Sequence, residues 1–365
     1  MPRPIRYATD PQSLRREGLS ETIAPWEDGL RAETGRGSFE WWYFDAHFED
    51  GSTAVIVFLT KPLLERNGPL KPGVSLTITD PHGVKRVGFP LLPPEAFAAS
   101  KETCDVHIGP HQARYIPSEG ATWRYEVHVE NVKDERGETL SADLTFTGLV
   151  PPWRPGAGKV YFGDREHYFA WLPAIPYGHV TGQVTYGGKQ HAVRGTGYHD
   201  HNWGNVALGA VMDHWYWGRA HLGEYTVIFV EQVAARAYGF ARIPVFMLAK
   251  GERILTGDGN PLRMSACDFV PHTGGHRYPR QVDFEWQGEN GEVYLALRRP
   301  RLREAVSLLT TFPAWQRALL RLFGNPYYFR FEADLELKVD FEGTHAIESG
   351  TALYEIMLLQ GRWHP

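Results

Sequence analysis

The chain has 365 residues, of which 42% are hydrophobic and 22% charged, and 38 basic against 43 acidic side chains give a net charge of −5. This balance is typical of a soluble globular protein and argues against a disordered chain, while the length favours two domains. No block of like charge stands out, so we expect no nucleic-acid partner.

The termini and the cysteines bound the cellular context. The first residues lack the apolar stretch of a signal peptide, and no apolar run of about 18 residues could span a bilayer. We therefore expect a cytoplasmic protein, for which a lipophilic substrate would still allow peripheral contact with a membrane. Cys104 and Cys267 lie far apart, which predicts reduced thiols rather than a disulfide framework or a zinc site.

Short segments of alternating hydrophobicity dominate the chain and predict antiparallel strands. The clearest are 53–60, 74–79, 123–130, 144–148, 225–232 and 331–339. Only 94–100 and 302–323 favour helices, and Pro313 should divide the second into two. The expected fold class is mainly β with a few short helices.

An internal repeat organises these segments. The sequence WYF at 42–44 precedes AH at 46–47 and VI at 55–56, and WYW at 215–217 precedes AH at 220–221 and VI at 227–228. The offsets between the copies are 172 to 174 residues. The chain therefore reads as a duplication with small insertions or deletions.

A second pair of similar segments closes each half. HAV at 191–193 precedes Gly195, and HAI at 345–347 precedes Gly350. Similar opening and closing strands suit a sheet that closes on itself, since its first and last strands can pair. We predict two barrel-like domains, at 36–208 and 209–365, after an N-terminal extension at 1–35.

Titratable and aromatic side chains are densest at 197–204, GYHDHNWG, and at 213–219, DHWYWGR. These windows fall at the junction of the halves, where ligand pockets preferentially form. In an extended strand, His199, His201 and Trp203 share one face. Asp200 could then hydrogen-bond a nearby imidazole and raise its basicity, which suits proton transfer.

Two other interpretations of this cluster stay open. The run could be a buried hydrogen-bonded brace between strands, or His199, His201 and His214 could converge on a metal ion. The metal interpretation ranks lower because nothing nearby matches a metalloenzyme spacing. The chain also lacks nucleotide-binding, GxSxG and paired-cysteine motifs, which disfavours those chemistries.

The first half contributes EWWYFD at 40–45. Alternation places Trp42 with Phe44 on one face and Asp45 on the other. By pseudo-symmetry with the strand at 215–217, Glu40 and Asp45 are the first-half acids best placed to approach the space between the domains.

At these three motifs the sequence resembles the hydroxyneurosporene synthase family, also called carotenoid 1,2-hydratases, whose relatives include kievitone hydratase and fungal Diels–Alderases. The resemblance extends from about residue 37 to residue 354. It implies two tandem lipocalin-like antiparallel β-barrels with a cofactor-free active site between them. It also implies either protonation of an isolated prenyl double bond followed by water capture, or folding of a polyene for cycloaddition.

The residues fit alkene protonation, which needs an acid in a dry cavity and aromatic faces near the resulting cation. His201 with Asp200 could supply or relay the proton, and Tyr225 could donate a hydrogen bond or orient water. The carotenoid branch carries an aspartate soon after this tyrosine, but here the strand reads YTVI. Glu40, Asp45, Glu224 or Asp213 would have to supply the acid instead.

The leading hypothesis is therefore a hydratase or cyclase that protonates a carbon–carbon double bond of a lipophilic terpenoid or prenylated substrate, without cofactor or metal. A pericyclase and a non-catalytic lipid-binding protein are the alternatives. The predicted catalytic residues are His201, Asp200, Tyr225 and Glu40. The predicted substrate-binding residues are Trp42, His199, Asn202, Trp203, Trp215 and Trp217.

Overall fold

The computed structural model describes residues 1–117, 120, 122–272, 275–311 and 325–360, and it divides the chain into two compact units. The sequence placed the domain boundary after residue 208, and here the division falls after Ala207. The first unit comprises Tyr7–Tyr161 and Arg165–Ala207; the second comprises Met1–Arg6, Phe162–Asp164 and Leu208–Pro365.

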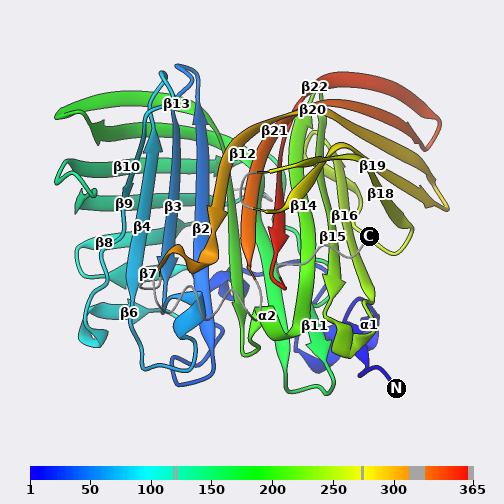
Figure 1. Cartoon of the computed structure of the whole chain (residues 1–365), viewed down its shortest axis with the longest axis horizontal. Helices are drawn as coiled ribbons and strands as arrows, with labels where there is room; N and C mark the ends of the chain where they lie inside the picture. The colour runs from blue at the N-terminus through cyan, green and yellow to red at the C-terminus, as the bar shows by residue number, and fades with distance from the viewer. Residues whose placement is uncertain (118–119, 121, 273–274, 312–324, 361–365) are drawn as a thin grey trace. The chain divides into compact units, whose positions relative to one another are not determined.

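The first unit is built on a thirteen-stranded sheet, blue to green in Figure 1, with the order β5-β4-β3-β2-β13-β12-β10-β9-β8-β7-β6 and with β11 joining β12 to β1. A bridge between Gly88 and Asp134 brings the end of β5 to the end of β9, so the sheet curls around its core. The strands are β1 (Ile5–Tyr7), β2 (Phe39–Phe48), β3 (Thr53–Leu59), β4 (Gly73–Thr79), β5 (Lys85–Gly88), β6 (Phe97–Ala99), β7 (Asp105–Ile108), β8 (His111–Ile116), β9 (Arg124–Lys133), β10 (Thr139–Gly148), β11 (Lys159–Phe162), β12 (Tyr168–Tyr186) and β13 (Lys189–Gly204).

The second unit holds a nine-stranded sheet, light green to red in Figure 1, with the order β17-β16-β15-β14-β22-β21-β20-β19-β18. The Trp286 indole N–H donates to the Asp258 carbonyl at 2.7 Å, which ties β19 to the loop after β17. The strands are β14 (Met212–Leu222), β15 (Tyr225–Ala234), β16 (Arg242–Lys250), β17 (Arg253–Thr256), β18 (Leu262–Pro271), β19 (Arg277–Gly288), β20 (Gly291–Ser307), β21 (Tyr327–Phe341) and β22 (Thr344–Leu358).

In each unit the opening strand pairs with the closing strand, as the repeat predicted. Trp42 of β2 lies opposite His201 of β13, and Tyr216 of β14 lies opposite Ile356 of β22. All six segments predicted as strands are strands, because alternating Val, Ile, Thr and aromatic residues bury one face of a pleated sheet. The mainly β, tandem lipocalin-like class is confirmed.

The pairing corrects the register of the repeat at its aromatic triplet. Trp42 is fully buried in the core of the first unit, whereas Trp215 is half-buried and its neighbour Tyr216 faces the core of the second. The counterpart of Trp42 is therefore Tyr216, 174 residues later, in the same register as Ala46 and Ala220. A shift of one residue moves every side chain to the opposite face of a strand.

Both helix predictions need correction. Residues 94–100 form a single 3-10 turn followed by strand β6, and residues 302–307 belong to strand β20. The apolar residues there recur near helical spacing, but β20 pairs with β21 over Tyr327–Phe341, and this tertiary pairing outweighs the local pattern. The predicted helix after Pro313 lies outside the described residues.

The helical turns are short. Among the described residues, none of these helices has the length and apolarity needed to cross a membrane. They are α1 (Pro11–Arg16), η1 (Pro25–Asp28), η2 (Leu63–Glu65), η3 (Pro94–Ala96), α2 (Leu208–Val211), η4 (Arg236–Tyr238) and η5 (Leu308–Thr311).

Candidate functional site

Strand β13 carries two polar networks on opposite faces, as its alternation predicted. His199 stacks on Phe44 with ring centroids 3.9 Å apart, and His201 stacks on Trp42 at 4.6 Å. Because Phe44 and Trp42 are core residues of the first unit, both imidazoles point into that core, where they are fully buried.

His201 lies between two carboxylates. Its Nε2 is 2.7 Å from Glu40 Oε1, and its Nδ1 is 3.3 Å from Asp28 Oδ1 in a contact without hydrogen-bond alignment. Glu40 also accepts the backbone N–H groups of Arg31 and Ala32, each at 2.7 Å. The predicted pair of Glu40 and His201 is thus brought together, and Glu40 is held in place by the chain before β2.

Asp28 completes this inner cluster, although it was not among the residues predicted from the sequence. Its Oδ2 accepts the Tyr125 hydroxyl at 2.6 Å and lies 3.1 Å from His199 Nε2. His199 Nδ1 donates to the Tyr43 carbonyl at 2.9 Å, which leaves Nε2 for Asp28. Asp28 ends the 3-10 turn η1 in the segment treated as an extension, and no sequence motif marks it.

The inner cluster is a set of buried charges. Burial alone would raise the pKa of Asp28, but the His199 and His201 imidazoles hold it well below its usual range. Burial alone would lower the pKa of His201, but Asp28 and Glu40 raise it above its ordinary value. The structure therefore favours a protonated His201 clamped between two acids, a group that can store and pass on a proton.

The second unit shows that the fold does not need this cluster. Where β13 places His199 opposite Phe44 and His201 opposite Trp42, β22 places Tyr354 opposite Gly218 and Ile356 opposite Tyr216. Tyr354 and Ile356 belong to the core of the second unit. The equivalent sheet of the second unit thus closes without buried histidines at these positions. A bracing role therefore does not by itself explain His199 and His201.

The outer network of β13 is centred on Asp200. Its carboxylate accepts the Trp171 indole N–H at 2.8 Å, the Tyr198 hydroxyl at 2.8 Å and the Asn202 amide at 2.7 Å. Burial raises the pKa of Asp200, although these three donors oppose the shift. Asp200 therefore hydrogen-bonds neither His199 nor His201, from which alternation directs it away, and the expected support of His201 by Asp200 is not found within the first unit.

Asp45 also lies on this outer face, apart from Glu40. Its Oδ2 accepts the Tyr43 hydroxyl at 3.1 Å, and its Oδ1 is 3.2 Å from His47 Nε2. Of the two acids singled out in EWWYFD, only Glu40 contacts the His201 cluster.

The remaining predicted residues belong to the second unit. Tyr225 is buried in its apolar core, and Trp215 and Trp217 are half-buried on the face of β14 opposite Tyr216. His214 Nδ1 lies 2.7 Å from Asp213 Oδ2. Neither unit by itself brings these side chains to His201, so the predicted grouping with Tyr225 and the tryptophans stays a prediction.

In the first unit, three buried residues of types that commonly bind metal ions lie close together. Potential ligand atoms of Asp28, Cys104 and His199 all lie within 4.8 Å of one another. Asp28 Oδ2 already accepts from Tyr125 and His199, and burial raises the pKa of Cys104 well above its usual range. A protonated thiol is a poor ligand, so this group fits a hydrogen-bonded cluster better than a metal site.

A cavity of about 190 Å³ lies beside the inner cluster. Trp203 lines it and also contacts His201, with ring centroids 4.7 Å apart. Arg31 lines it too, and the Arg31 backbone N–H donates to Glu40. The other lining residues are Glu17, Leu19, Trp26, Glu27, Arg154, Ala157, Lys159, Tyr168 and Leu172.

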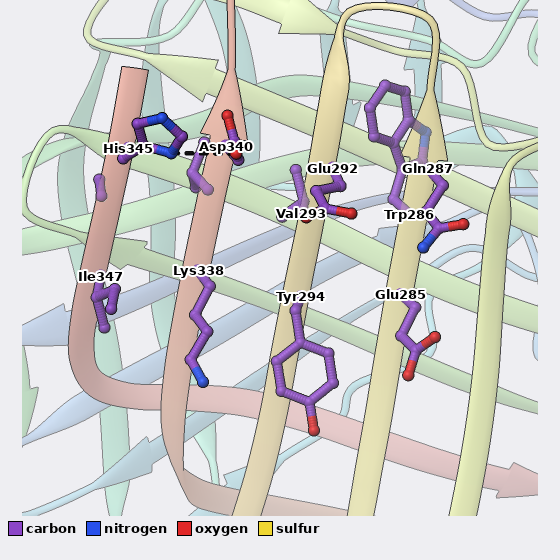
Figure 2. Close-up of a pocket in the computed structure, with 12 residues that line it drawn as sticks. Glu285, Trp286, Gln287, Glu292, Val293, Tyr294, Lys338, Asp340, His345 and Ile347 are labelled. Carbon is purple, nitrogen blue, oxygen red and sulfur yellow. Dashed lines mark ion pairs between the residues drawn. The ribbon is translucent and has the colours of Figure 1, made fainter. Parts of the chain in front are cut away.

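A larger, more open pocket of about 540 Å³ lies on strands β19 to β22 of the second unit (Figure 2). Glu285, Tyr294, Lys338 and Ile347 form one row across the four strands. An ion pair joins His345 to Asp340 at 3.0 Å, drawn as a dashed line. None of the predicted site residues lines this pocket, and its charged groups lie on an exposed sheet face.

Residues 40–301 match the family described as a domain of unknown function, DUF7064. The chain belongs to this family. It is 39% identical over 115 residues to a protein named quinolone epoxide rearrangement protein penF, from Penicillium thymicola, covering 30% of each chain. It is 25% identical over 236 residues to one named hydroxyneurosporene dehydrogenase, from Chlorobaculum tepidum, covering 54% of this chain and 59% of that one. The matches thus span less than two thirds of these relatives.

Solved structures share the fold across nearly the whole chain. Kievitone hydratase from Nectria haematococca superposes with a TM-score of 0.52 at 15% identity, covering 97% of this chain and 93% of that one. CghA with Sch210972 gives 0.57 at 14% identity, covering 94% and 98%. An AttH-type protein from Nitrosomonas europaea gives 0.57 at 16%, covering 94% and 99%. Together the comparisons confirm the resemblance found from the sequence motifs.

Proposed function

We propose that this chain is an enzyme of the hydratase, isomerase or cyclase type that protonates a carbon–carbon double bond of a lipophilic terpenoid or prenylated substrate. The observation that carries the proposal is the buried cluster of His201, Glu40 and Asp28. At the position of His201, the second unit has the apolar Ile356. Buried ionisable groups with shifted pKa values concentrate at functional sites.

The names of the relatives support the reaction class. A protein named for an epoxide rearrangement matches in sequence, and a hydratase shares the fold. The hydroxyneurosporene dehydrogenase is named for a carotenoid substrate, which fits a lipophilic terpenoid. Hydration and rearrangement can both begin with proton transfer to a substrate, and the fold alone does not select between them.

His201 and Glu40 act in this proposal as one proton-holding unit. Both nitrogens of His201 face carboxylates, so the proton shared between Nε2 and Glu40 Oε1 is the one available for transfer. Trp203 contacts His201 and lines the neighbouring cavity. Its indole face suits stabilisation of the carbocation that alkene protonation creates.

The test is turnover of prenylated and polyene compounds in deuterated water by the wild type, His201→Gln and Glu40→Gln. We expect deuterium at carbon in the product and a loss of roughly 100-fold or more in kcat for both variants, the usual contribution of general acid–base catalysis. His111→Gln is the matched control, because His111 is a buried imidazole of the same unit outside the cluster.

Three outcomes contradict the proposal. Equal rates for wild type and folded His201→Gln would remove the cluster from the chemistry. Product formed without carbon-bound deuterium would favour a pericyclase, and a lipid retained without conversion would favour a binding protein.

A further inference from the structure

We infer that the cavity beside Trp203 is a binding site for an aromatic carboxylate, a single ring bearing one negative charge. The inference concerns binding by the first unit alone, and it rests on the proposed function only for the step from binding to turnover.

The size and the walls of the cavity suit one ring. Its volume is about 190 Å³, and an apolar cavity of about 150 Å³ is enough to hold benzene. Trp26, Tyr168 and Trp203 offer aromatic surface, and Leu172 adds an apolar wall. Offset or edge contacts between rings favour an aromatic occupant over an aliphatic one of equal volume.

The charges lining the cavity leave one cation in excess. Lys159 Nζ lies 2.5 Å from Glu17 Oε2, and Arg154 Nε lies 2.6 Å from Glu27 Oε2. Each of these cations is therefore matched by an acid. Arg31 is the third cation in the lining.

Arg31 has no such acid. Among the described residues no carboxylate lies within 4.0 Å of its guanidinium, which donates to the backbone carbonyls of Gly29 and Lys101 and lies 5.0 Å above the Trp26 ring. Burial lowers the pKa of Arg31, and more distant carboxylates, of which Glu40 and Glu102 act most strongly, offset only part of this shift. A carboxylate in the cavity would supply the missing partner, in the bidentate geometry that arginine favours.

The same residue links the cavity to the proposed chemistry. The Arg31 backbone N–H donates to the Glu40 oxygen that also contacts His201. Trp203, which also lines the cavity, contacts His201, so an occupant of the cavity would be separated from the proton-holding pair by this one side chain.

Binding of benzoate to the full chain, followed by calorimetry or tryptophan fluorescence, tests the inference. Benzyl alcohol is the control that keeps the ring but lacks the charge. Acetate is the control that keeps the charge but lacks the ring. We expect saturable benzoate binding, about tenfold weaker binding of benzyl alcohol because the charge-assisted hydrogen bond is lost, and no saturation by acetate.

Variants assign the site. Arg31→Gln should weaken benzoate about tenfold and leave benzyl alcohol unchanged. Arg31→Lys keeps the charge but loses the bidentate fork, so it should weaken benzoate by less than Arg31→Gln does. Leu172→Phe should weaken both ligands by filling the cavity. Arg114→Gln is the control, because Arg114 is an exposed arginine of β8 away from the cavity lining.

The inference is overturned if benzoate does not saturate, if benzoate and benzyl alcohol bind equally, or if Arg31→Gln and Arg114→Gln have the same effect on benzoate. Should Arg31→Gln fail to fold, Arg31→Lys and Leu172→Phe still give the comparison. Because binding is read without turnover, a correct binding pattern together with unaffected turnover in His201→Gln would reject the proposed function alone.

Discussion

Replacing Glu40 by Gln measures how much the charged inner cluster contributes to the free energy of unfolding. The carboxylate contacts His201 at 2.7 Å and accepts two backbone N–H groups, all in a fully buried setting. Removing one partner of a buried ion pair typically costs 3–5 kcal/mol. Asp28 remains 3.3 Å from His201 and retains part of the attraction, so we expect a loss of about 3 kcal/mol in the free energy of unfolding at pH 6.

The pH dependence follows from the raised pKa of His201. A group whose pKa is raised on folding stabilises the protein fully below its unfolded value, about 6.5, and this contribution is lost as pH rises through the folded value. The difference in unfolding free energy between wild type and Glu40→Gln should therefore be largest near pH 6 and shrink towards pH 9.

Urea unfolding of the two proteins across this pH range measures the difference. Glu126→Gln is the control, because Glu126 forms a surface pair with Arg114 at 2.9 Å and such pairs contribute at most about 1 kcal/mol. A loss at Glu40 below about 1 kcal/mol at pH 6, or one that grows with pH, would refute the description of a charged, clamped His201.

Two further predictions concern other buried groups of the first unit. The pKa of Asp200 is raised and that of Asp28 lowered, so at pH 7 the ionised form costs stability at Asp200 and contributes it at Asp28. In urea unfolding at pH 7, Asp200→Asn should be neutral or stabilising and Asp28→Asn should lose more than about 2 kcal/mol; the reverse order would contradict the assignment. Burial raises the pKa of Cys104, while Cys267 is exposed. Titration with a thiol reagent should modify Cys267 alone in the folded protein and both after denaturation, and rapid native modification of Cys104 would show that its core opens.

The duplication separates what the scaffold needs from what the chemistry needs. Both units close by pairing their first and last strands, but only the first places histidines at the core positions of its closing strand. The second uses Tyr354 and Ile356 there. Duplicated units share the physical demands of closure, so a difference at equivalent core positions points to function in the one that carries the polar groups.

The sequence by itself determined the β-class, the strands and the two faces of β13, since each follows from a period of two that local residues set. It also determined the repeat, because matching motifs recur 172 to 174 residues apart. It also brought forward His201 and Glu40, because they stand in dense aromatic motifs. Residues 302–307 were misread because apolar spacing over so short a stretch does not distinguish a helix from a strand whose partner is twenty or more residues away.

Only the tertiary structure decided which acid meets which imidazole. Asp200 is adjacent to His201 in sequence yet faces the opposite side of the strand, whereas Asp28 is 173 positions away and lies 3.3 Å from it. Contacts within a strand follow from alternation, but a contact between a strand and a turn near the N-terminus depends on how the chain packs across the sheet. No local pattern records that packing, and it is the packing that makes the buried charges a cluster.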